Sequence, residues 1–144
     1  MAEHAERRVS RVLFLCTHNS ARSQMAEGML RILGKGAYDV ESAGKVATGV
    51  RLEAVAAMRE LDIDISGQHS KTLERFLGER FDYVVTVCDS ANEACPVFPG
   101  ARVRLHWPVD DPAAVEGSEA ERLAAFRRTR DELRRRIETE LLVR

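Results

Sequence analysis

The fold of this chain is decided by the stretch Val12–Glu27, VLFLCTHNSARSQMAE. Four apolar residues lead into Cys16, five residues separate Cys16 from Arg22, and a helix-like pattern follows. This order predicts a buried strand, a tight loop and the first turn of a helix. Successive backbone N–H groups in such a loop can converge on an anion, and the helix dipole adds positive potential at the same point.

Cys16 and Arg22 have complementary chemistry at this loop. N–H groups around the thiolate of Cys16 stabilise it, which makes the sulfur a nucleophile near neutral pH. Arg22 carries a planar fork that grips two oxygens of a tetrahedral anion. The alternative is a structural cysteine and an unrelated surface arginine, which a bare Cys-x5-Arg spacing would allow. The strand, loop and helix context favours a site for a phosphate-like dianion in front of the Cys16 sulfur.

The segment Cys16–Gly28, CTHNSARSQMAEG, resembles the phosphate loop of the low-molecular-weight protein tyrosine phosphatase superfamily. It is most similar to the thioredoxin-coupled arsenate reductases of that superfamily. His18 stands where many relatives have glycine, and Ala21 where some have cysteine, but neither change removes a required group. The oxyanion-binding residues that the resemblance implies are Thr17, His18, Asn19, Ser20, Ala21, Arg22 and Ser23. Asn19 and Ser23 are expected to brace the loop, and the Ser23 hydroxyl to donate a hydrogen bond to Cys16.

Length and composition indicate one domain in residues 11–144, preceded by a polar leader in residues 1–10. The chain has 144 residues and a net charge of −1, so no bulk attraction to nucleic acid or to a membrane surface is expected. The leader lacks the apolar core of a secretory signal, and the three cysteines are an odd count that fits poorly with a secreted disulfide framework. We therefore expect a cytoplasmic monomer.

Alternating strand and helix patterns predict an α/β fold, a doubly wound four-stranded parallel sheet flanked by helices. The expected strands are Arg11–Leu15, Tyr38–Ser42, Phe81–Val87 and Ala101–His106. The expected helices are one from an N-cap at Ser23 to Gly34, Val50–Leu61, a short one in Lys71–Leu77, and a C-terminal one after the capping box Ser118–Glu121. The apolar face of the second helix is expected to hold Leu52, Val55, Ala56 and Met58. The carboxyl ends of parallel strands meet at one edge, so Cys16, Cys88 and the segment after His106 should come together there.

Cys88 and Cys95 form a second group of candidate residues. In a helix, their spacing of seven positions separates them by roughly 10 Å along the axis, whereas a disulfide requires Cα atoms within about 7 Å. If this segment is helical when reduced, it must rearrange before the pair can be oxidised. The alternatives are inert packing, an incidental stress-sensing pair, and half of a zinc site, although no second cysteine pair or suitably spaced histidine pair accompanies them. The resemblance implies a three-cysteine relay of Cys16, Cys88 and Cys95.

Asp110-Asp111-Pro112 resembles the general-acid loop of the superfamily, in which the acid is the aspartate before proline. This assigns the role to Asp111, with Asp110 as the second candidate. A proton donor is required because an oxygen leaves the central atom as sulfur attacks. The alternative is a turn or helix cap before Pro112, a common role for Asp-Pro, and this alternative suits Asp110 better than Asp111.

The resemblance also implies a potassium site near the loop, to which Asn19, Glu27 and Ser42 correspond. Lys71 aligns with a further acidic contributor to that site, and its ammonium group can take the place of the cation. We therefore expect no bound cofactor, no metal and little dependence on potassium.

Three functions compete at this stage. The resemblance implies an arsenate reductase of arsenic detoxification, which converts arsenate to arsenite and is recycled by thioredoxin. The second function is a phosphotyrosine or small phosphomonoester phosphatase that uses the same Cys16, Arg22 and Asp111. Here Ala113-Ala114 follows the acid loop, where phosphatases of the family tend to carry aromatic residues. The third is a non-catalytic sensor that binds oxyanion or arsenite through its thiols.

Overall fold

The computed structural model describes residues 9–89 and 93–142 and contains the predicted four-stranded parallel sheet. The strand order is β2-β1-β3-β4, and every neighbouring pair is parallel. The strands are β1 (Ser10–Cys16), β2 (Tyr38–Gly44), β3 (Phe81–Val87) and β4 (Ala101–Trp107). All four predicted strands are therefore confirmed, with ends that differ by two residues at most.

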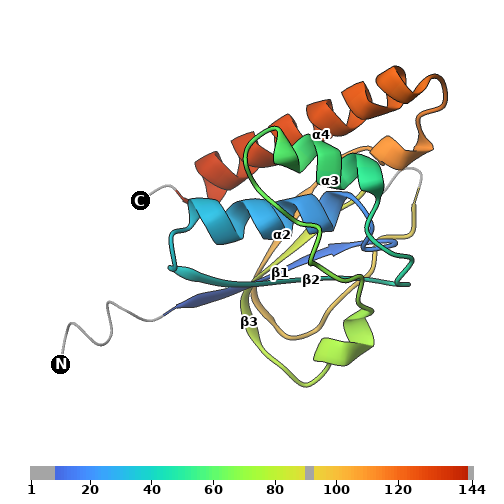
Figure 1. Cartoon of the computed structure of the whole chain (residues 1–144). Helices are drawn as coiled ribbons and strands as arrows, with labels where there is room; N and C mark the ends of the chain where they lie inside the picture. The colour runs from blue at the N-terminus through green and yellow to red at the C-terminus, as the bar shows by residue number, and fades with distance from the viewer. Residues whose placement is uncertain (1–8, 90–92, 143–144) are drawn as a thin grey trace.

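Helices flank the sheet unequally on its two sides, as Figure 1 shows. The three α-helices lie on one side, and a short 3-10 helix lies on the other. The α-helices are α2 (Arg22–Leu33), α3 (Leu52–Arg59) and α4 (Glu119–Glu140). The 3-10 helix on the opposite side is η1 (Leu73–Phe76), and a second one, η2 (Pro112–Ala114), precedes α4.

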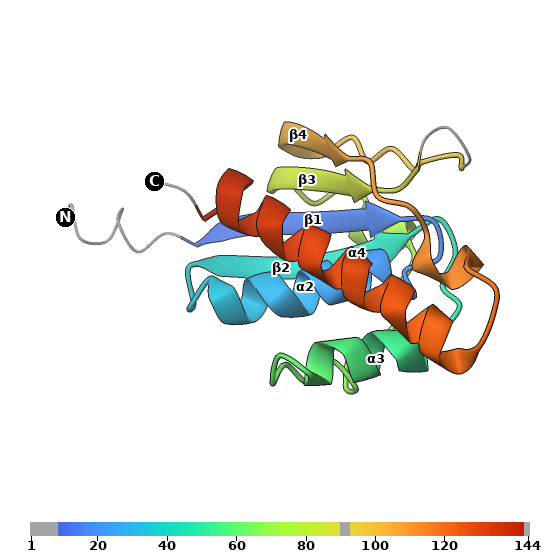
Figure 2. The ribbon, with the colours of Figure 1, turned by 90° about the horizontal axis from the view of Figure 1, so that it is seen from above.

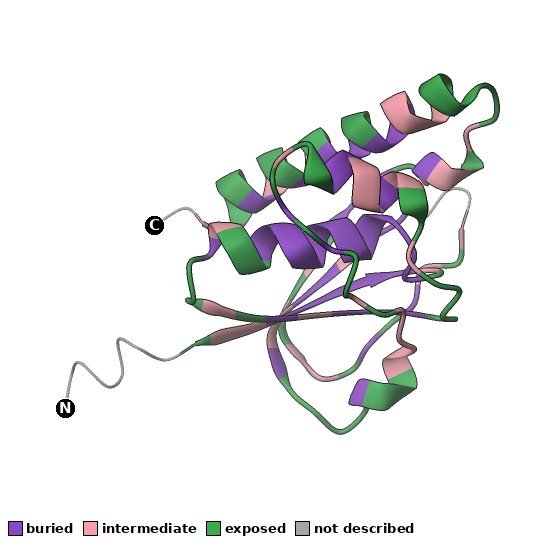
Figure 3. Cartoon of the chain, viewed as in Figure 1, coloured by how far each residue is buried: buried purple, intermediate pink, exposed green. Residues whose placement is uncertain are grey.

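Strand β1 is buried on both faces, which explains its uninterrupted apolar run. Val12 and Phe14 pack on the helix side, whereas Leu13 and Leu15 pack on the opposite side in a cluster with Phe76, Phe81 and Phe98. Figure 3 shows most of β1 and of α2 as buried, with the first two residues of β1 only partly so. Because successive side chains of a strand point to opposite faces, β1 joins the two halves of the core.

Of the helix caps predicted from the sequence, the one at Ser118 is present and the one at Ser23 is not. The capping box at the start of α4 is present: Ser118 Oγ accepts from Glu121 N at 3.0 Å, and Glu121 Oε1 accepts from Ser118 N at 2.8 Å. The predicted cap at Ser23 is wrong, because α2 already begins at Arg22 and the residue before it, Ala21, makes no side-chain cap. Within the expected helix 71–77, only η1 forms.

The predicted apolar face of α3 is wrong at Leu52. This side chain is 82% exposed, and the fully buried residues of α3 are Ala54, Ala57 and Met58. The helix is turned so that two small alanines face the core cluster containing Phe126 of α4. Small side chains allow two helices to approach closely, and this contact determines the rotation of α3.

The carboxyl ends of β1, β3 and β4 meet at one edge of the sheet, as Figure 2 shows. The loop after β1 leads into α2, Cys88 follows β3, and the segment after β4 leads to η2. Candidate site residues from three distant parts of the sequence therefore lie at the same edge of the sheet. No helix within residues 9–89 and 93–142 is long and apolar enough to cross a membrane.

Gly44 at the end of β2 allows the close approach of the loop that follows β1. A Cβ atom on Gly44 would lie 2.7 Å from Asn19 N, 2.7 Å from Val46 O and 2.9 Å from Thr17 O. We therefore predict that Gly44→Ala lowers the free energy of unfolding by about 1–3 kcal/mol, because backbone atoms must shift. Urea unfolding measures the change. Gly67→Ala is the control, since a Cβ there meets nothing within 4 Å; equal losses in both variants would contradict the prediction.

Candidate active site

Cys16 ends β1 and is almost fully buried, with 2% of its surface exposed. Its Sγ lies 2.8 Å from Ser23 Oγ. Ser23 Oγ also accepts a hydrogen bond from Asn19 Nδ2 at 2.8 Å, which leaves the hydroxyl hydrogen able to point at sulfur. The structure thus contains the hydrogen bond that the sequence predicted between Ser23 and Cys16.

Asn19 holds the loop in shape from a fully buried position. Its backbone has a positive φ of 51°, a left-handed conformation that asparagine tolerates better than most residues. Nδ2 donates to Ser23 Oγ and, at 2.9 Å, to Ser42 Oγ. Oδ1 accepts from Gln24 Nε2 at 2.9 Å and from Lys71 N at 2.7 Å. These four bonds connect the loop to α2, β2 and the segment before η1.

Gln24 is a bracing residue that sequence reasoning missed. Its Nε2 donates to Asn19 O at 3.1 Å and to His69 O at 2.9 Å. Its Oε1 accepts from Gln68 Nε2 at 2.7 Å. Nothing local marked this role, because the partners Gln68 and His69 lie more than forty residues away in the chain.

Glu27, which the resemblance places at the potassium site, is a buried residue of α2. Its Oε1 accepts from Ser42 Oγ at 2.5 Å and lies 3.5 Å from Lys71 Nζ. Its Oε2 accepts from Arg31 Nη2 at 2.6 Å. Lys71 Nζ also donates to His69 O at 3.1 Å. The carboxylate is thus surrounded by a hydroxyl and two cationic side chains.

Arg22 lies at the mouth of the loop, with 2% of its side chain exposed. Its Nη1 donates to Val109 O at 3.0 Å and to Glu93 Oε2 at 2.6 Å, and its Nη2 donates to Glu93 Oε1 at 2.7 Å. Burial acts to lower the pKa of Arg22, but the Glu93 hydrogen bonds and the charges of Cys16 and Asp111 raise it above its usual value. The guanidinium is therefore a permanent cation facing the sulfur.

Asp111 makes the helix cap that the sequence analysis had assigned to its neighbour Asp110, and it also lies near Arg22. Its Oδ1 caps η2 by accepting from Ala113 N at 2.9 Å, and its Oδ2 lies 3.9 Å from Arg22 Nη2. Asp110 is exposed. The expectation that the cap belonged to Asp110 is wrong, because the chain turns into η2 immediately after Asp111.

Glu93 is the second residue that sequence reasoning missed. Besides its paired bonds with Arg22, its Oε1 accepts from Thr17 Oγ1 at 2.6 Å. Its Oε2 accepts from Asp89 N at 3.0 Å. Burial acts to raise the pKa of Glu93, but the hydrogen bonds from Arg22, Thr17 and the Asp89 amide lower it to about 2. The sequence signal that could have identified this residue is the position of an acidic side chain between Cys88 and Cys95.

Cys88 and Cys95 form a disulfide, with Cα atoms 6.2 Å apart, and Cys16 is free. His106 from β4 lies beside the pair, and one ring nitrogen and the two sulfurs are all within 4.8 Å of one another. Its Nδ1 is 2.7 Å from Thr86 Oγ1. The sequence analysis found no histidine suitably spaced for a metal site, whereas the sheet brings this one from the neighbouring strand. In this state the two sulfurs are bonded to each other rather than available as thiolates.

The remaining residues of the predicted oxyanion loop differ in exposure. His18 is exposed and Thr17 is half-buried. The backbone of the loop is tied to the segment after β2, since Val46 N donates to Thr17 O at 3.1 Å and Arg51 N donates to Ser20 O at 2.9 Å. Ser20 and Ala21 are buried.

The structure places buried Cys16 and Arg22 at the two ends of one loop, with Asp111 3.9 Å from the arginine. Residues 11–142 match the family described as low molecular weight phosphotyrosine protein phosphatase. This chain belongs to that family. The match covers almost the whole chain, so the family assignment applies to the entire domain.

Several relatives within the family are arsenate reductases. That of Halalkalibacterium halodurans is 49% identical over 128 residues, which are 89% of this chain and 92% of the relative. That of Bacillus subtilis is 44% identical over 126 residues, which are 88% of this chain and 91% of the relative. Both relatives therefore align with this chain over nearly their full length.

Solved structures similar to this chain also include arsenate reductases. An arsenate reductase in the oxidised state is 34% identical, with a TM-score of 0.76 and coverage of 90% of this chain and 95% of that one. A thioredoxin-dependent arsenate reductase of Corynebacterium glutamicum is 26% identical, with a TM-score of 0.59 and coverage of 95% of this chain and 66% of that one.

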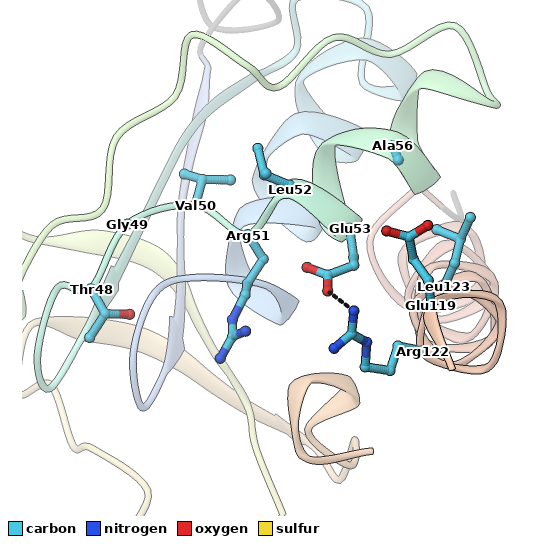
Figure 4. A pocket seen from close by; sticks show the side chains of 10 residues that line it. All are labelled: Thr48, Gly49, Val50, Arg51, Leu52, Glu53, Ala56, Glu119, Arg122 and Leu123. Atoms are coloured by element: carbon cyan, nitrogen blue, oxygen red, sulfur yellow. Dashed lines mark ion pairs between the residues drawn. The ribbon is translucent and has the colours of Figure 1, made fainter. Parts of the chain in front are cut away.

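A groove of about 770 Å³ adjoins the oxyanion loop, as Figure 4 shows. Arg51 extends into it, and Arg122 on the opposite wall lies 3.9 Å from Glu53. The lining residues are Thr48, Gly49, Val50, Arg51, Leu52, Glu53, Ala56, Glu119, Arg122 and Leu123. None of them is aromatic, so the groove offers no ring for stacking.

We predict that Ser23→Ala slows alkylation of Cys16 by iodoacetamide at pH 7 by about tenfold, because a hydrogen bond to a charged group contributes roughly 1.5–3 kcal/mol. The measurement uses the disulfide form of the protein, in which Cys16 is the free thiol. Ser66→Ala, at an exposed serine, is the matched control and should react at the unmodified rate. Equal rates for Ser23→Ala and the parent chain would contradict the role of Ser23.

Proposed function

We propose that this chain is an arsenate reductase that converts arsenate to arsenite through a disulfide relay of Cys16, Cys88 and Cys95 and is recycled by thioredoxin. One observation carries the proposal: Cys16 is free in an oxyanion loop, and the segment closed by the Cys88–Cys95 disulfide contacts the arginine of that loop. The relatives and the solved thioredoxin-dependent reductase support the same substrate and reductant.

In the first step, the Cys16 thiolate attacks arsenic while Arg22 and the loop amides hold the arsenate oxygens. An As–O bond breaks, and Asp111 gives its proton to the leaving hydroxyl, which departs as water. The position of Asp111 Oδ2 near Arg22 supports this role, since the two groups face the same anion. The product is an arsenic(V) adduct on Cys16.

In the second step, the Cys88 thiolate attacks the sulfur of Cys16. The S–As bond breaks and its electron pair stays on arsenic, which is reduced from arsenic(V) to arsenic(III) and leaves as arsenite. The two sulfurs are oxidised to a Cys16–Cys88 disulfide. A thiol-bound phosphate has no corresponding reduction and must be hydrolysed by water.

In the third step, the Cys95 thiolate attacks the sulfur of Cys88 and releases the Cys16 thiolate. The resulting Cys88–Cys95 disulfide is the state of the structure. Over the three steps, the thiols of Cys88 and Cys95 have supplied the two electrons that arsenic takes up. A thioredoxin dithiol then reduces the Cys88–Cys95 disulfide back to two thiols.

The phosphatase remains the second candidate because it needs only Cys16, Arg22 and Asp111. Two observations make it a weaker one. The groove beside the loop has no aromatic lining, and the small residues Ala113 and Ala114 follow Asp111. A phosphotyrosine ring would therefore find little surface on which to stack.

The proposal predicts that Cys95→Ser loses multiple turnover and accumulates a Cys16–Cys88 disulfide, because the third step has no nucleophile. The assay is arsenate-dependent NADPH oxidation with thioredoxin and thioredoxin reductase, followed by mass spectrometry of the unreduced protein. Cys88→Ser is the control, which should lose the same activity without trapping this disulfide.

Hydrolysis of an aryl phosphate, measured in parallel, separates the competing functions. Brisk hydrolysis without arsenate turnover, unchanged by substitution of Cys88 or Cys95, would identify a phosphatase. Full multiple turnover of Cys95→Ser would refute the relay. A non-catalytic sensor would bind the oxyanion and turn over neither substrate.

We further propose that Lys71 replaces the potassium ion that the family resemblance implies. The oxygens that would coordinate potassium are already used: Asn19 Oδ1 accepts two hydrogen bonds, and Glu27 is paired with Lys71 and Arg31. The donor set therefore does not fit an additional cation.

This second proposal predicts equal arsenate reduction rates in potassium and sodium salts. Lys71→Ala should create a preference for potassium, because it removes the ammonium beside Glu27 and Glu41. Steady-state rates at matched ionic strength measure both effects. A large acceleration of the parent chain by potassium would contradict the proposal.

A further inference from the structure

The carboxylate of Glu93 is held by the same groups that should hold the substrate. Both of its oxygens pair with Arg22, at 2.6 and 2.7 Å, and one also accepts from Thr17 Oγ1 at 2.6 Å. A planar guanidinium grips a carboxylate and two oxygens of a tetrahedral oxyanion in the same bidentate way. Glu93 therefore occupies the arginine side of the oxyanion site.

An incoming oxyanion cannot share these donors with Glu93. Of the other groups near the guanidinium, Val109 O accepts from Nη1 at 3.0 Å, and Asp111 Oδ2 lies 3.9 Å from Nη2. A second anion would have to displace the carboxylate or bind without the arginine fork, and the two negative charges would repel each other at short range. Arsenate or phosphate therefore competes directly with Glu93 in this state.

The position of Glu93 depends on the disulfide. Glu93 lies two residues before Cys95, and the disulfide fixes the Cα atoms of Cys88 and Cys95 at 6.2 Å. Within this closed segment, Glu93 N donates to Asp89 O at 2.8 Å, and Asp89 N donates back to Glu93 Oε2 at 3.0 Å. Breaking the disulfide removes the covalent link between Cys88 and Cys95, and so a constraint on Glu93 at Arg22.

We propose that Glu93 is a specificity-determining residue that acts as an internal substrate mimic, excluding the oxyanion from the disulfide form and releasing the site when Cys88–Cys95 is reduced. The role of this exclusion in a catalytic cycle rests on the proposed reductase function. In the disulfide form no thiol of Cys88 is available, so an arsenate adduct on Cys16 could not be reduced. Exclusion prevents formation of that unproductive adduct.

The ionisation of Glu93 agrees with this role. Its pKa is lowered to about 2, whereas an ordinary glutamate has a pKa of about 4.3. The Glu93–Arg22 pair therefore stabilises the folded state fully at pH values above the ordinary pKa of glutamate. This stabilisation is lost only as the pH falls toward about 2. At neutral pH the carboxylate remains a permanent competitor for Arg22.

The test is isothermal titration of inorganic phosphate into the full chain in its disulfide form. We expect Glu93→Gln and Glu93→Ala to bind phosphate at least about tenfold more tightly than the parent chain, since loss of a charge-assisted pair is worth this much in affinity. Glu116→Gln makes the same charge change at an exposed position and should bind like the parent. Circular dichroism of each variant checks the fold.

A second arm compares the parent chain before and after reduction. Reduction should raise its affinity for phosphate to that of the Glu93 variants and leave the affinity of the variants nearly unchanged. Equal binding by the parent and both Glu93 variants in the disulfide form would overturn the proposal, as would an equal gain in affinity for Glu116→Gln.

These binding measurements do not depend on turnover, so the two proposals fail separately. Absence of arsenate-dependent NADPH oxidation with the tenfold difference intact would refute the reductase function alone. Normal turnover with no effect of Glu93 on phosphate binding would refute the substrate-mimic role alone.

Discussion

The oxyanion loop depends on the buried side chain of Asn19. A loop that directs its N–H groups at an anion cannot also use them to stabilise its own fold, so other groups must hold it. Asn19 supplies these bonds from a left-handed conformation, donating to Ser23 and Ser42 and accepting from Gln24 and Lys71. Through them the loop is tied to α2, β2 and the segment before η1.

The sheet provides the second constraint, since it determines which distant residues can meet. β1 is central and buried on both faces, and β3 and β4 lie in order beside it. Their carboxyl ends place Cys16 and Cys88 at the same edge of the sheet, and His106 of β4 lies beside the Cys88–Cys95 pair. The sheet thus brings the loop after β1, the Cys88–Cys95 pair and the segment after β4 to one edge, where Cys16 and Val109 also belong to the core cluster.

Charge pairs at Arg22 connect the loop after β1 with the cysteine segment and with the segment after β4. Arg22 is buried with two carboxylates, Glu93 from the redox segment and Asp111 from the acid loop. A buried guanidinium needs negative partners, because desolvation of an unpaired charge is costly. In the disulfide form Glu93 is the partner, and a tetrahedral oxyanion likewise offers negative charge and two oxygens to the arginine. Because Glu93 lies between the two cysteines, the pairing of this one arginine links the cysteine segment to the loop of Cys16.

The sequence by itself determined the order of strands and helices, the loop between Cys16 and Arg22, the capping box at Ser118 and the position of the acid loop. These features rest on local patterns, namely apolar runs, turn residues and short motifs, that depend on neighbouring residues. Only the tertiary structure decided the rest. Lys71 meets Glu27 across 44 positions, His106 reaches the cysteine pair from a neighbouring strand, and Leu52 is exposed because two alanines of α3 face the core. Glu93 could not be placed from its neighbours, because its partners Arg22 and Thr17 lie more than seventy positions earlier and are brought near it by the fold alone.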